Sequence, residues 1–309
     1  MAQGVPDDIV RVRVPAKINL ALRVGPRRDD GYHPLATIYQ AVSLFDEITV
    51  HPAMPGEFSL VLDAGADDRP LDVPTGDDNL ALRAARLLAG QIDDDSLGAR
   101  IVLRKSIPVA AGLAGGSADA AGTLLALTEL WDVDLDPDEL SELAAQLGSD
   151  VPFALLGGTA VGTGRGEALV PALTRGTYHY VLAVAFGGLS TPQVYGRFDE
   201  LVGQPAVPEV SRDVLHALAA ADPAALAGAL SNDLAVAAFD PRPDLSDTLA
   251  TGLDAGALAG LVCGSGPTLL FLAADEASAV DLSNRLARSG TCAGVRRVSG
   301  PVPGARLLG

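Results

Sequence analysis

A run of small residues from Pro108 to Ala121, PVAAGLAGGSADAA, has the composition of a phosphate-binding loop. Such a site needs backbone N–H groups that converge on one point, and a helix N-terminus whose dipole favours negative charge. Small side chains let a phosphate approach those amides, and only Val109, Leu113 and Asp119 are larger than Gly, Ala, Ser or Pro. The alternative interpretation is a flexible linker that leads into a packed helix.

The loop differs from the two commonest phosphate motifs. No Lys-Ser/Thr pair closes it as in a Walker loop, and it is not a GxGxxG run after a first strand. It does follow a strand-like segment, Ala99 to Ile107, and it opens into an alanine-rich segment expected to be helical from Ser117 to Leu130. Ser117 is expected to cap that helix and to offer its hydroxyl to phosphate or to Mg²⁺. The position favours phosphate binding, while the motif alone leaves both interpretations open.

Lys17 lies in an otherwise apolar strand-like segment, PAKINLAL. A lysine that faced the core unpaired would cost free energy, so it either points to solvent or lines a polar pocket. Asn19 lies two residues on, hence on the same strand face, which favours the pocket. Lys17 and Lys105 are the only lysines among 22 basic residues, which adds slight weight to a specific role for each.

The elements that must position these residues follow from hydrophobic periodicity and helix caps. A helix begins at Asp136, where Asp is the N-cap, Pro137 occupies the first turn and Glu139 follows, and it ends at Gly148. The other predicted helices start at Asp78-Asn79, lie between Ser211 and Ala255, and span Asp275 to Arg288. Strands are predicted at Ile9–Val14, again after Pro15, and at Ala41–Val50, Phe58–Asp63, Tyr178–Phe186, Leu258–Val262 and Thr268–Ala273, with a last one near the end.

These elements predict an α+β protein of two domains. At 309 residues the chain is long enough for two fused domains. The pattern changes in a glycine-dense stretch, so the boundary is placed near Gly162 to Gly164, giving domains at 1–163 and 164–309.

Composition excludes several classes of partner. The formal net charge of −17 repels nucleic acid and anionic membranes, although a small anionic substrate can still be held by local amides and cations. The longest apolar run, Tyr180 to Phe186, is too short to cross a bilayer, and the N-terminus does not resemble a secretory signal. A cytoplasmic protein is therefore expected, as a monomer or weak homodimer. Cys263 and Cys292 are expected to be unpaired thiols, with a single bridge as the alternative.

Three motifs together resemble the GHMP kinase superfamily: PAKINLAL, PVAAGLAGGSADAA and VCGSGPTLLF. The segments DGYHPL, LGSDVPF and STPQVY look most like the branch that phosphorylates 4-diphosphocytidyl-2-C-methyl-D-erythritol in the non-mevalonate isoprenoid pathway. The resemblance covers nearly the whole chain. It implies a two-domain fold with an N-terminal ATP-binding domain, a C-terminal substrate domain and an active site in the cleft between them.

The resemblance also implies the catalytic pair. It assigns the base to Asp150 of LGSDVPF and the assisting cation to Lys17, and the reaction to transfer of a phosphoryl group from ATP to the 2-hydroxyl. The alternative for Asp150 is ordinary helix N-cap chemistry, because Ser-Asp precedes Val-Pro.

The same resemblance assigns the substrate site. Tyr32 and Tyr195 are expected to stack on the cytosine base and His33 to bond its edge, while Thr191 and nearby amides suit the diphosphate. The alternatives are a turn aromatic for Tyr32, a surface histidine for His33 and an ordinary hairpin turn at Gly264 to Gly266. The implied substrate contacts are Asn19, Tyr32, His33, Thr191, Tyr195, Gly264, Ser265 and Gly266.

ATP with Mg²⁺ is the implied cofactor, and no metal ligand is assigned in the chain. Ala110, Ala111 and Ala114 stand at positions that are often glycine in the family, so the loop keeps its shape only if none of them needs a positive φ. Asp119 replaces a frequent Asn or Ser and receives no ligand role. The implied ATP contacts are Asn79, Leu80, Lys105, Pro108, Val109, Ala110, Ala111, Gly112, Leu113, Ala114, Gly115, Gly116 and Ser117.

Two rival functions remain. One is another GHMP kinase that acts on mevalonate, homoserine or a sugar, against which DGYHPL and STPQVY argue. The other is a catalytically dead relative that senses nucleotide, against which Lys17 and Asp150 argue.

Overall fold

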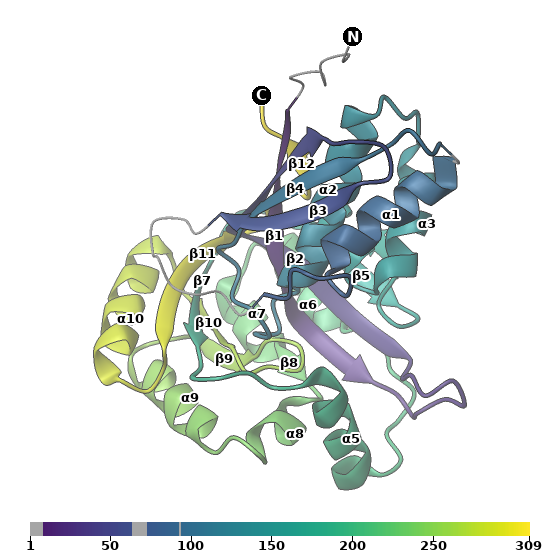
Figure 1. The fold of residues 1–309 in the computed structure, drawn as a ribbon. Helices are drawn as coiled ribbons and strands as arrows, with labels where there is room; N and C mark the ends of the chain where they lie inside the picture. Colours follow the sequence, from purple (N-terminus) through teal and green to yellow (C-terminus); the bar gives the residue numbers. More distant parts are fainter. Residues whose placement is uncertain (1–8, 64–72, 93) are drawn as a thin grey trace.

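Two β-sheets form the framework of the protein (Figure 1). The computed structural model describes residues 9–63, 73–92 and 94–309. The first sheet has the order β12-β1-β2-β4-β3, with β5 paired to β2, β6 to β5 and β8 to β1. The second sheet has the order β11-β7-β10-β9. The strands are β1 (Val10–Val24), β2 (Leu35–Pro52), β3 (Phe58–Asp63), β4 (Ala99–Arg104), β5 (Thr159–Thr163), β6 (Ala168–Pro171), β7 (Tyr178–Val184), β8 (Ser231–Asn232), β9 (Ala259–Val262), β10 (Leu269–Ala273), β11 (Gly294–Gly300) and β12 (Arg306–Leu307).

Helices cover both sheets. Figure 1 shows α1, α2 and α3 beside the first sheet, and α9 and α10 on the outer side of the second. The helices are α1 (Leu80–Ile92), α2 (Gly115–Leu130), α3 (Pro137–Leu147), α4 (Val151–Leu156), α5 (Thr191–Val202), α6 (Arg212–Ala220), α7 (Pro223–Ala229), α8 (Ala235–Phe239), α9 (Asp244–Asp254) and α10 (Glu276–Ser289). The mixture of helices and strands confirms the predicted α+β class.

The strand that carries Lys17 is longer than predicted. The sequence predicts two short strands separated at Pro15, but β1 is continuous and pairs with β2 throughout. The pairing register shifts between Pro15 and Ala16 and again between Asn19 and Ala21. Such bulges absorb a residue that cannot join the ladder and redirect the side chains that follow, so the strand continues past the proline.

Helix caps are partly as predicted. The side chain of Asp136 accepts from the N–H groups of Asp138 and Glu139, and the complete capping box confirms the start of α3. The prediction that Ser117 caps α2 is wrong, because α2 begins two residues earlier, at Gly115, and its N-cap is Ala114. Ala114 has left-handed backbone geometry and offers no side chain for capping, so the first amides of α2 have no cap from it.

The two faces of the second sheet bury different cores. Tyr180 and Leu182 of β7 face the large core that also contains β1, α2 and α6, whereas Val181 and Ala183 face the core formed with α5, α8, α9 and α10. This alternation is what period-two side chains dictate for a sheet covered on both sides. The chain crosses between the sheets more than once, since β8 and β12 join the first sheet although both follow β7 of the second. The division at 163/164 stays a prediction.

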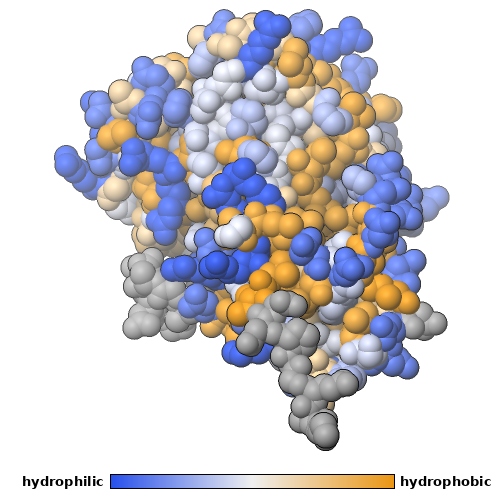
Figure 2. All heavy atoms as spheres, turned by 90° about the horizontal axis from the view of Figure 1, so that it is seen from above, coloured by the Kyte–Doolittle hydropathy of each residue, from blue (hydrophilic) through white to orange (hydrophobic). Residues whose placement is uncertain are grey.

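The face seen in Figure 2 is mixed, with orange hydrophobic residues beside neutral and blue hydrophilic ones across its middle. Apolar atoms contribute more than half of ordinary protein surface, so this face by itself indicates no partner. In the part of the chain that the structure describes, no helix is long and apolar enough to cross a membrane. Both cysteines lie in this part and both are free, which confirms the expectation of unpaired thiols.

Candidate functional site

A cavity of about 800 Å³ collects most of the predicted site residues. It is lined from β1, the phosphate loop, the segment before α4, α5 and the turn between β9 and β10. Leu113 and Gly266 do not line it: Leu113 is 1% exposed and packs in the large core, and Gly266 lies against Val262. The predicted residues that line the cavity are Lys17, Asn19, Tyr32, His33, Asn79, Leu80, Lys105, Pro108, Val109, Ala110, Ala111, Gly112, Ala114, Gly115, Gly116, Ser117, Asp150, Thr191, Tyr195, Gly264 and Ser265.

The phosphate loop is pressed against the turn after β9. Gly112 has φ 79°, and a Cβ there would lie 2.1 Å from the carbonyl oxygen of Cys263, so only glycine fits. Ala110 and Ala114 also have positive φ, 52° and 58°. The sequence predicts an unchanged loop only if none of its alanines has a positive φ, and Ala110 and Ala114 do not meet this requirement. Each holds a left-handed conformation that costs an L-residue about 1–2 kcal/mol. The loop keeps its shape at that cost.

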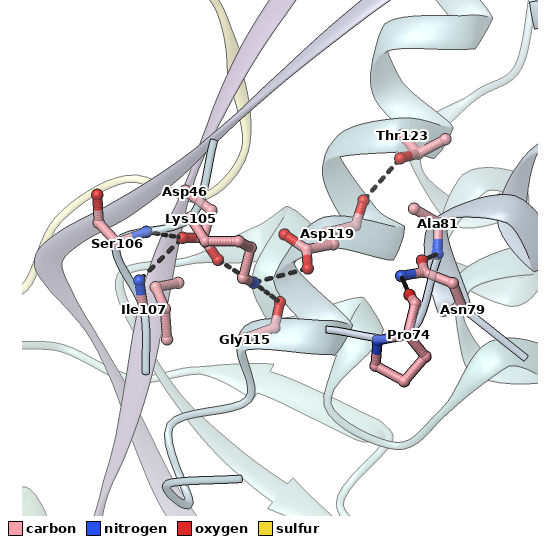
Figure 3. A network of polar contacts seen from close by, with 10 residues as sticks. All are labelled: Asp46, Pro74, Asn79, Ala81, Lys105, Ser106, Ile107, Gly115, Asp119 and Thr123. Carbon is pink, nitrogen blue, oxygen red and sulfur yellow. Dashed lines mark hydrogen bonds and ion pairs between the residues drawn. The ribbon is translucent and has the colours of Figure 1, made fainter. Parts of the chain in front are cut away.

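Lys105 is buried beneath the loop. Its Nζ lies 2.5 Å from Asp46 Oδ2 and 2.6 Å from Asp119 Oδ2, and it donates to the carbonyl of Gly115 at 3.3 Å (Figure 3). Burial lowers the pKa of Lys105, but the charges of Asp119 and Asp46 outweigh it and leave the pKa raised. These carboxylates already neutralise the ammonium, which therefore has little charge left for a nucleotide. The predicted adenine contact of Lys105 stays a prediction that this geometry does not favour.

Asp119 lacks full compensation. Burial raises its pKa to about 7, although the charge of Lys105 opposes that rise. Its Oδ1 is buried and has no hydrogen-bond partner among the described residues. Asp119 was noticed in the sequence, but Asp46, which completes the cluster, carried no local signal because it lies within a strand.

Lys17 and Asp150 lie together in the cavity. The Nζ of Lys17 is 3.5 Å from Asp150 Oδ2 and donates to Asn19 Oδ1 at 2.9 Å. Asn19 in turn donates to Thr37 at 2.8 Å, which fixes the orientation of its amide. In this described segment the Asp150 side chain makes no capping bond to α4, so the alternative interpretation of Asp150 as a helix cap is wrong.

Tyr39 was not identified from the sequence. Its ring lies under the ammonium of Lys17, with Nζ 5.5 Å from the ring centroid, a cation–π arrangement. Burial, and next the charge of Asp150, raise the pKa of the Tyr39 hydroxyl well above its usual value. The phenol therefore stays protonated and can donate toward Asp150. Tyr39 is one of many aromatic residues in strands, and nothing in its local pattern distinguished it.

The aromatic residues predicted for the base line one end of the cavity. The rings of His33 and Tyr195 lie 5.2 Å apart, while Tyr32 is 54% exposed and has the guanidinium of Arg165 5.1 Å from its ring centroid. His33 is buried, which excludes the alternative of an ordinary surface histidine. A flat ligand against the ring of Tyr32 or of Tyr195 would gain stacking energy.

Both ring nitrogens of His33 have partners. Nδ1 lies 2.9 Å from the carbonyl oxygen of Gly25, and Nε2 lies 3.3 Å from Asp199 Oδ1. Because the Gly25 carbonyl can only accept, Nδ1 carries a hydrogen and donates it. The other ring nitrogen, Nε2, faces Asp199. Asp199 projects from α5 one turn after Tyr195, and only the folded structure reveals that it meets His33.

The turn after β9 is held by side chains from elsewhere. Ser265 and Thr191 hydroxyls lie 2.8 Å apart, and Asn232 donates to the carbonyls of Val262 and Gly264 at 2.8 and 2.7 Å. Gly264 approaches the catalytic pair closely, since a Cβ there would lie 3.4 Å from Lys17 Nζ. This turn is therefore part of the cavity wall as well as a hairpin.

Asn79 caps α1. Its Oδ1 accepts from the N–H of Ala81 at 2.8 Å, and its Nδ2 donates to the carbonyl of Pro74 at 2.6 Å. The cap places Leu80 at the cavity wall beside the phosphate loop, where a Cβ on Gly116 would lie 3.6 Å from Leu80 Cδ1.

Comparison with known proteins identifies the family. The GHMP kinases N terminal domain model matches residues 79–158, and the GHMP kinases C terminal model matches residues 214–292. A 4-diphosphocytidyl-2-C-methyl-D-erythritol kinase from Mycolicibacterium gilvum (strain PYR-GCK) is 51% identical over 315 residues, covering 99% of this chain and 95% of the relative.

Solved structures agree. The crystal structure of a 4-(cytidine 5'-diphospho)-2C-methyl-D-erythritol kinase superposes with a TM-score of 0.75 at 32% identity, covering 96% of this chain and 99% of the other. A homoserine kinase from Cytophaga hutchinsonii ATCC 33406 shares the fold, with a TM-score of 0.70 at 16% identity and full coverage of both chains. From its sequence, its two matched domains and its fold, this chain belongs to the GHMP kinase family.

Proposed function

We propose that this protein is an ATP-dependent kinase that phosphorylates the 2-hydroxyl of 4-diphosphocytidyl-2-C-methyl-D-erythritol, a step of isoprenoid synthesis by the non-mevalonate route. Its relatives at about half identity over nearly the full length carry that activity in their names. The observation that carries the proposal is the position of Lys17 and Asp150, which face each other in one cavity with a phosphate loop and two aromatic rings.

The phosphate loop and the N-terminus of α2 suit the phosphates of ATP. The first amides of a helix and its dipole attract anions, and the small residues of the loop leave them accessible. Ser117, in the first turn of α2, offers a hydroxyl to the same phosphates. These local groups are how a protein of net charge −17 can hold a polyanion.

Asp150 and Lys17 suit the transfer step. Asp150 accepts the proton of the substrate hydroxyl, whose oxygen forms a bond to the γ-phosphorus while the bond from that phosphorus to the bridging oxygen breaks and ADP leaves. The Lys17 ammonium neutralises charge on the moving phosphoryl group, and Asn19 holds that ammonium in place. Tyr39 lies below the pair and orients the carboxylate.

Mg²⁺ is expected to arrive with ATP. Within residues 9–63, 73–92 and 94–309, no group of three or more His, Cys, Asp or Glu side chains is arranged to hold a metal ion. The carboxylates nearest the loop, Asp46 and Asp119, are both engaged by Lys105. The phosphate oxygens and water would therefore supply most of its ligands, as is usual for Mg²⁺ with nucleotides.

The aromatic end of the cavity favours a nucleoside-linked alcohol over mevalonate, homoserine or a sugar. Those small alcohols would leave the wall formed by Tyr32, His33 and Tyr195 empty. A cytosine base would fill it, and the base would bond His33 Nε2 only by displacing Asp199, which lies 3.3 Å from that nitrogen. The likeness to the homoserine kinase concerns the fold alone.

The deciding experiment measures ADP release from wild type and Asp150→Asn with the cytidine-linked alcohol, mevalonate, homoserine and a hexose. We expect turnover with the cytidine-linked alcohol, and a loss of about 10²–10⁴ in kcat for the variant with nucleotide affinity kept. Nucleotide binding by the wild type with no turnover of any alcohol would instead support a sensing relative. Faster turnover of mevalonate, homoserine or the hexose than of the cytidine-linked alcohol would show that the proposed substrate is wrong.

Three further assignments remain predictions of the sequence. They are the domain division at 163/164, a cytoplasmic location, and a monomeric or weakly dimeric state. The cavity draws on residues from both sides of the proposed division, as an active site between two domains requires.

A further inference from the structure

Three buried charged side chains lie at the base of the phosphate loop. Asp46 is in β2, Lys105 follows β4, and Asp119 is in the second turn of α2 (Figure 3). Their side chains are 0%, 3% and 4% exposed. Substrate contact does not explain this burial, because the ammonium points to the two carboxylates.

The cluster joins both ends of the loop. At the first end, Asp46 Oδ1 accepts from the N–H groups of Ser106 and Ile107, at 2.6 and 2.9 Å. At the far end, Lys105 Nζ donates to the carbonyl of Gly115, the first residue of α2. Since Lys105 also contacts Asp46 and Asp119, one ammonium links the strand, the start of the loop and the helix.

The close approach of Lys105 to the start of α2 also explains why residue 115 is a glycine. A Cβ at this position would lie 3.3 Å from Lys105 Nζ and 3.1 Å from Ile107 Cγ2. A side chain would therefore push the helix away from the cluster. The glycine of the loop and the buried lysine are two parts of one close contact.

A buried ion cluster is a poor way to gain stability. Removing charges from water costs several kcal/mol per ion, and apolar replacements of similar size are often as stable or better. What such a cluster does supply is fixed geometry, because its hydrogen bonds accept few alternative arrangements. The groups it fixes here are the two ends of the phosphate loop.

We propose that Asp46, Lys105 and Asp119 form a clamp that positions the phosphate loop for ATP without touching the phosphates. The proposal rests on the ATP site proposed above. All three are positioning residues, which replaces the nucleotide contact predicted for Lys105.

The clamp is tested with Asp46→Asn and a matched control, Glu47→Gln. In the variant, Oδ1 can still accept from the loop, but the new amide N–H₂ faces Lys105, so the link to the ammonium is lost. Lys105 keeps its ion pair with Asp119, so its buried charge is still balanced and the variant is expected to fold. Glu47 is the next residue of β2, about half exposed, with Arg104 as its partner at 3.8 Å.

The measurement is the dissociation constant for ADP by calorimetry, with circular dichroism to establish folding. We expect Asp46→Asn to weaken ADP binding about tenfold or more, as loss of a hydrogen bond to a charged group does, and Glu47→Gln to change it less than about twofold. The KM for the alcohol should stay within about twofold in both. Folded Asp46→Asn with wild-type affinity for ADP overturns the proposal, and so does an equal loss in the control.

Asp119→Asn tests the clamp through the pH dependence of ADP binding, which a purely structural role of Asp119 would not change. The amide keeps an oxygen that can accept from Lys105, but it cannot titrate. The charged groups that act on Asp119 are Lys105 and Asp46, and on the α1 side Figure 3 shows the neutral Asn79.

Because burial raises the pKa of Asp119 to about 7, wild type gains a negative charge beside the loop as pH rises through neutrality. ADP affinity should therefore fall from pH 6 to pH 8.5 by about threefold more in wild type than in Asp119→Asn. Parallel curves, together with wild-type affinity for ADP in Asp119→Asn, remove Asp119 from the clamp. Both tests are decided by the affinity for ADP, so they remain decisive even if the proposed alcohol is not the substrate.

Discussion

The ammonium of Lys17 lies 3.5 Å from the carboxylate of Asp150, and each is held from a different part of the chain. Lys17 projects from β1, whereas Asp150 immediately precedes α4. Asp150 makes no capping bond in its described surroundings, and a buried lysine is costly unless it is paired.

Replacement of Lys17 by Met is expected to lower kcat by about 10²–10³, the usual cost of removing one group that stabilises transition-state charge. The Kd for ADP should change less than about threefold, because the loop and α2 carry most of that binding. Arg23→Gln, on the same strand but exposed and paired with Asp233, is the control and should leave kcat unchanged. Steady-state ADP release measures kcat in both variants, and calorimetry measures the Kd for ADP. Near-normal kcat in Lys17→Met would remove the lysine from the reaction.

Tyr195→Leu tests the base site. Loss of stacking is worth about 1–3 kcal/mol per base, so KM for the cytidine-linked alcohol should rise about 5- to 150-fold while KM for ATP stays constant. Tyr195→Phe keeps the ring 5.2 Å from His33 and should behave as wild type. If both variants weaken the alcohol equally, the hydroxyl rather than the ring makes the contact, and stacking is the wrong explanation.

Local features of the sequence predicted local features of the structure. The Asp136 capping box and the period-two placement of Lys17 and Asn19 on one face both depend on a few neighbouring residues. Such signals survive because the folded environment does not oppose them.

Contacts between distant segments could not be predicted in this way. Asp46 looks like any polar residue in a strand until β4 and α2 bring Lys105 and Asp119 against it. The meeting of Asp199 with His33 likewise depends on the packing of α5 over the loop before β2. The family resemblance supplied the pairing of Lys17 with Asp150, which no spacing in the sequence encodes.

The positive φ of Ala114 predicts an unusual response to glycine. Ala→Gly normally destabilises by about 0.4–1 kcal/mol through the unfolded chain, but at Ala114 it also relieves about 1–2 kcal/mol of left-handed strain. Ala114→Gly should therefore be neutral or raise the free energy of unfolding by up to about 1.6 kcal/mol. Ala206→Gly, at an exposed loop residue outside the positive-φ set, should lower it. Urea unfolding measures both, and equal destabilisation by the two would contradict the strain.

The two thiols should differ in reactivity. Burial raises the pKa of Cys263 to about 12, although the nearby charge of Lys17 opposes it, so almost no thiolate exists at pH 8. Cys292 is only partly buried, and its pKa is raised by burial but less strongly. Because the thiolate is the reactive form, a disulfide reagent should label Cys292 in the native protein and reach Cys263 only after unfolding. Native Cys292→Ser should then resist labelling at pH 8, with full reaction in guanidinium as the control. Rapid modification of native Cys292→Ser would mean that the turn between β9 and β10 opens readily, since Cys263 is the first residue of that turn and lies beside the phosphate loop.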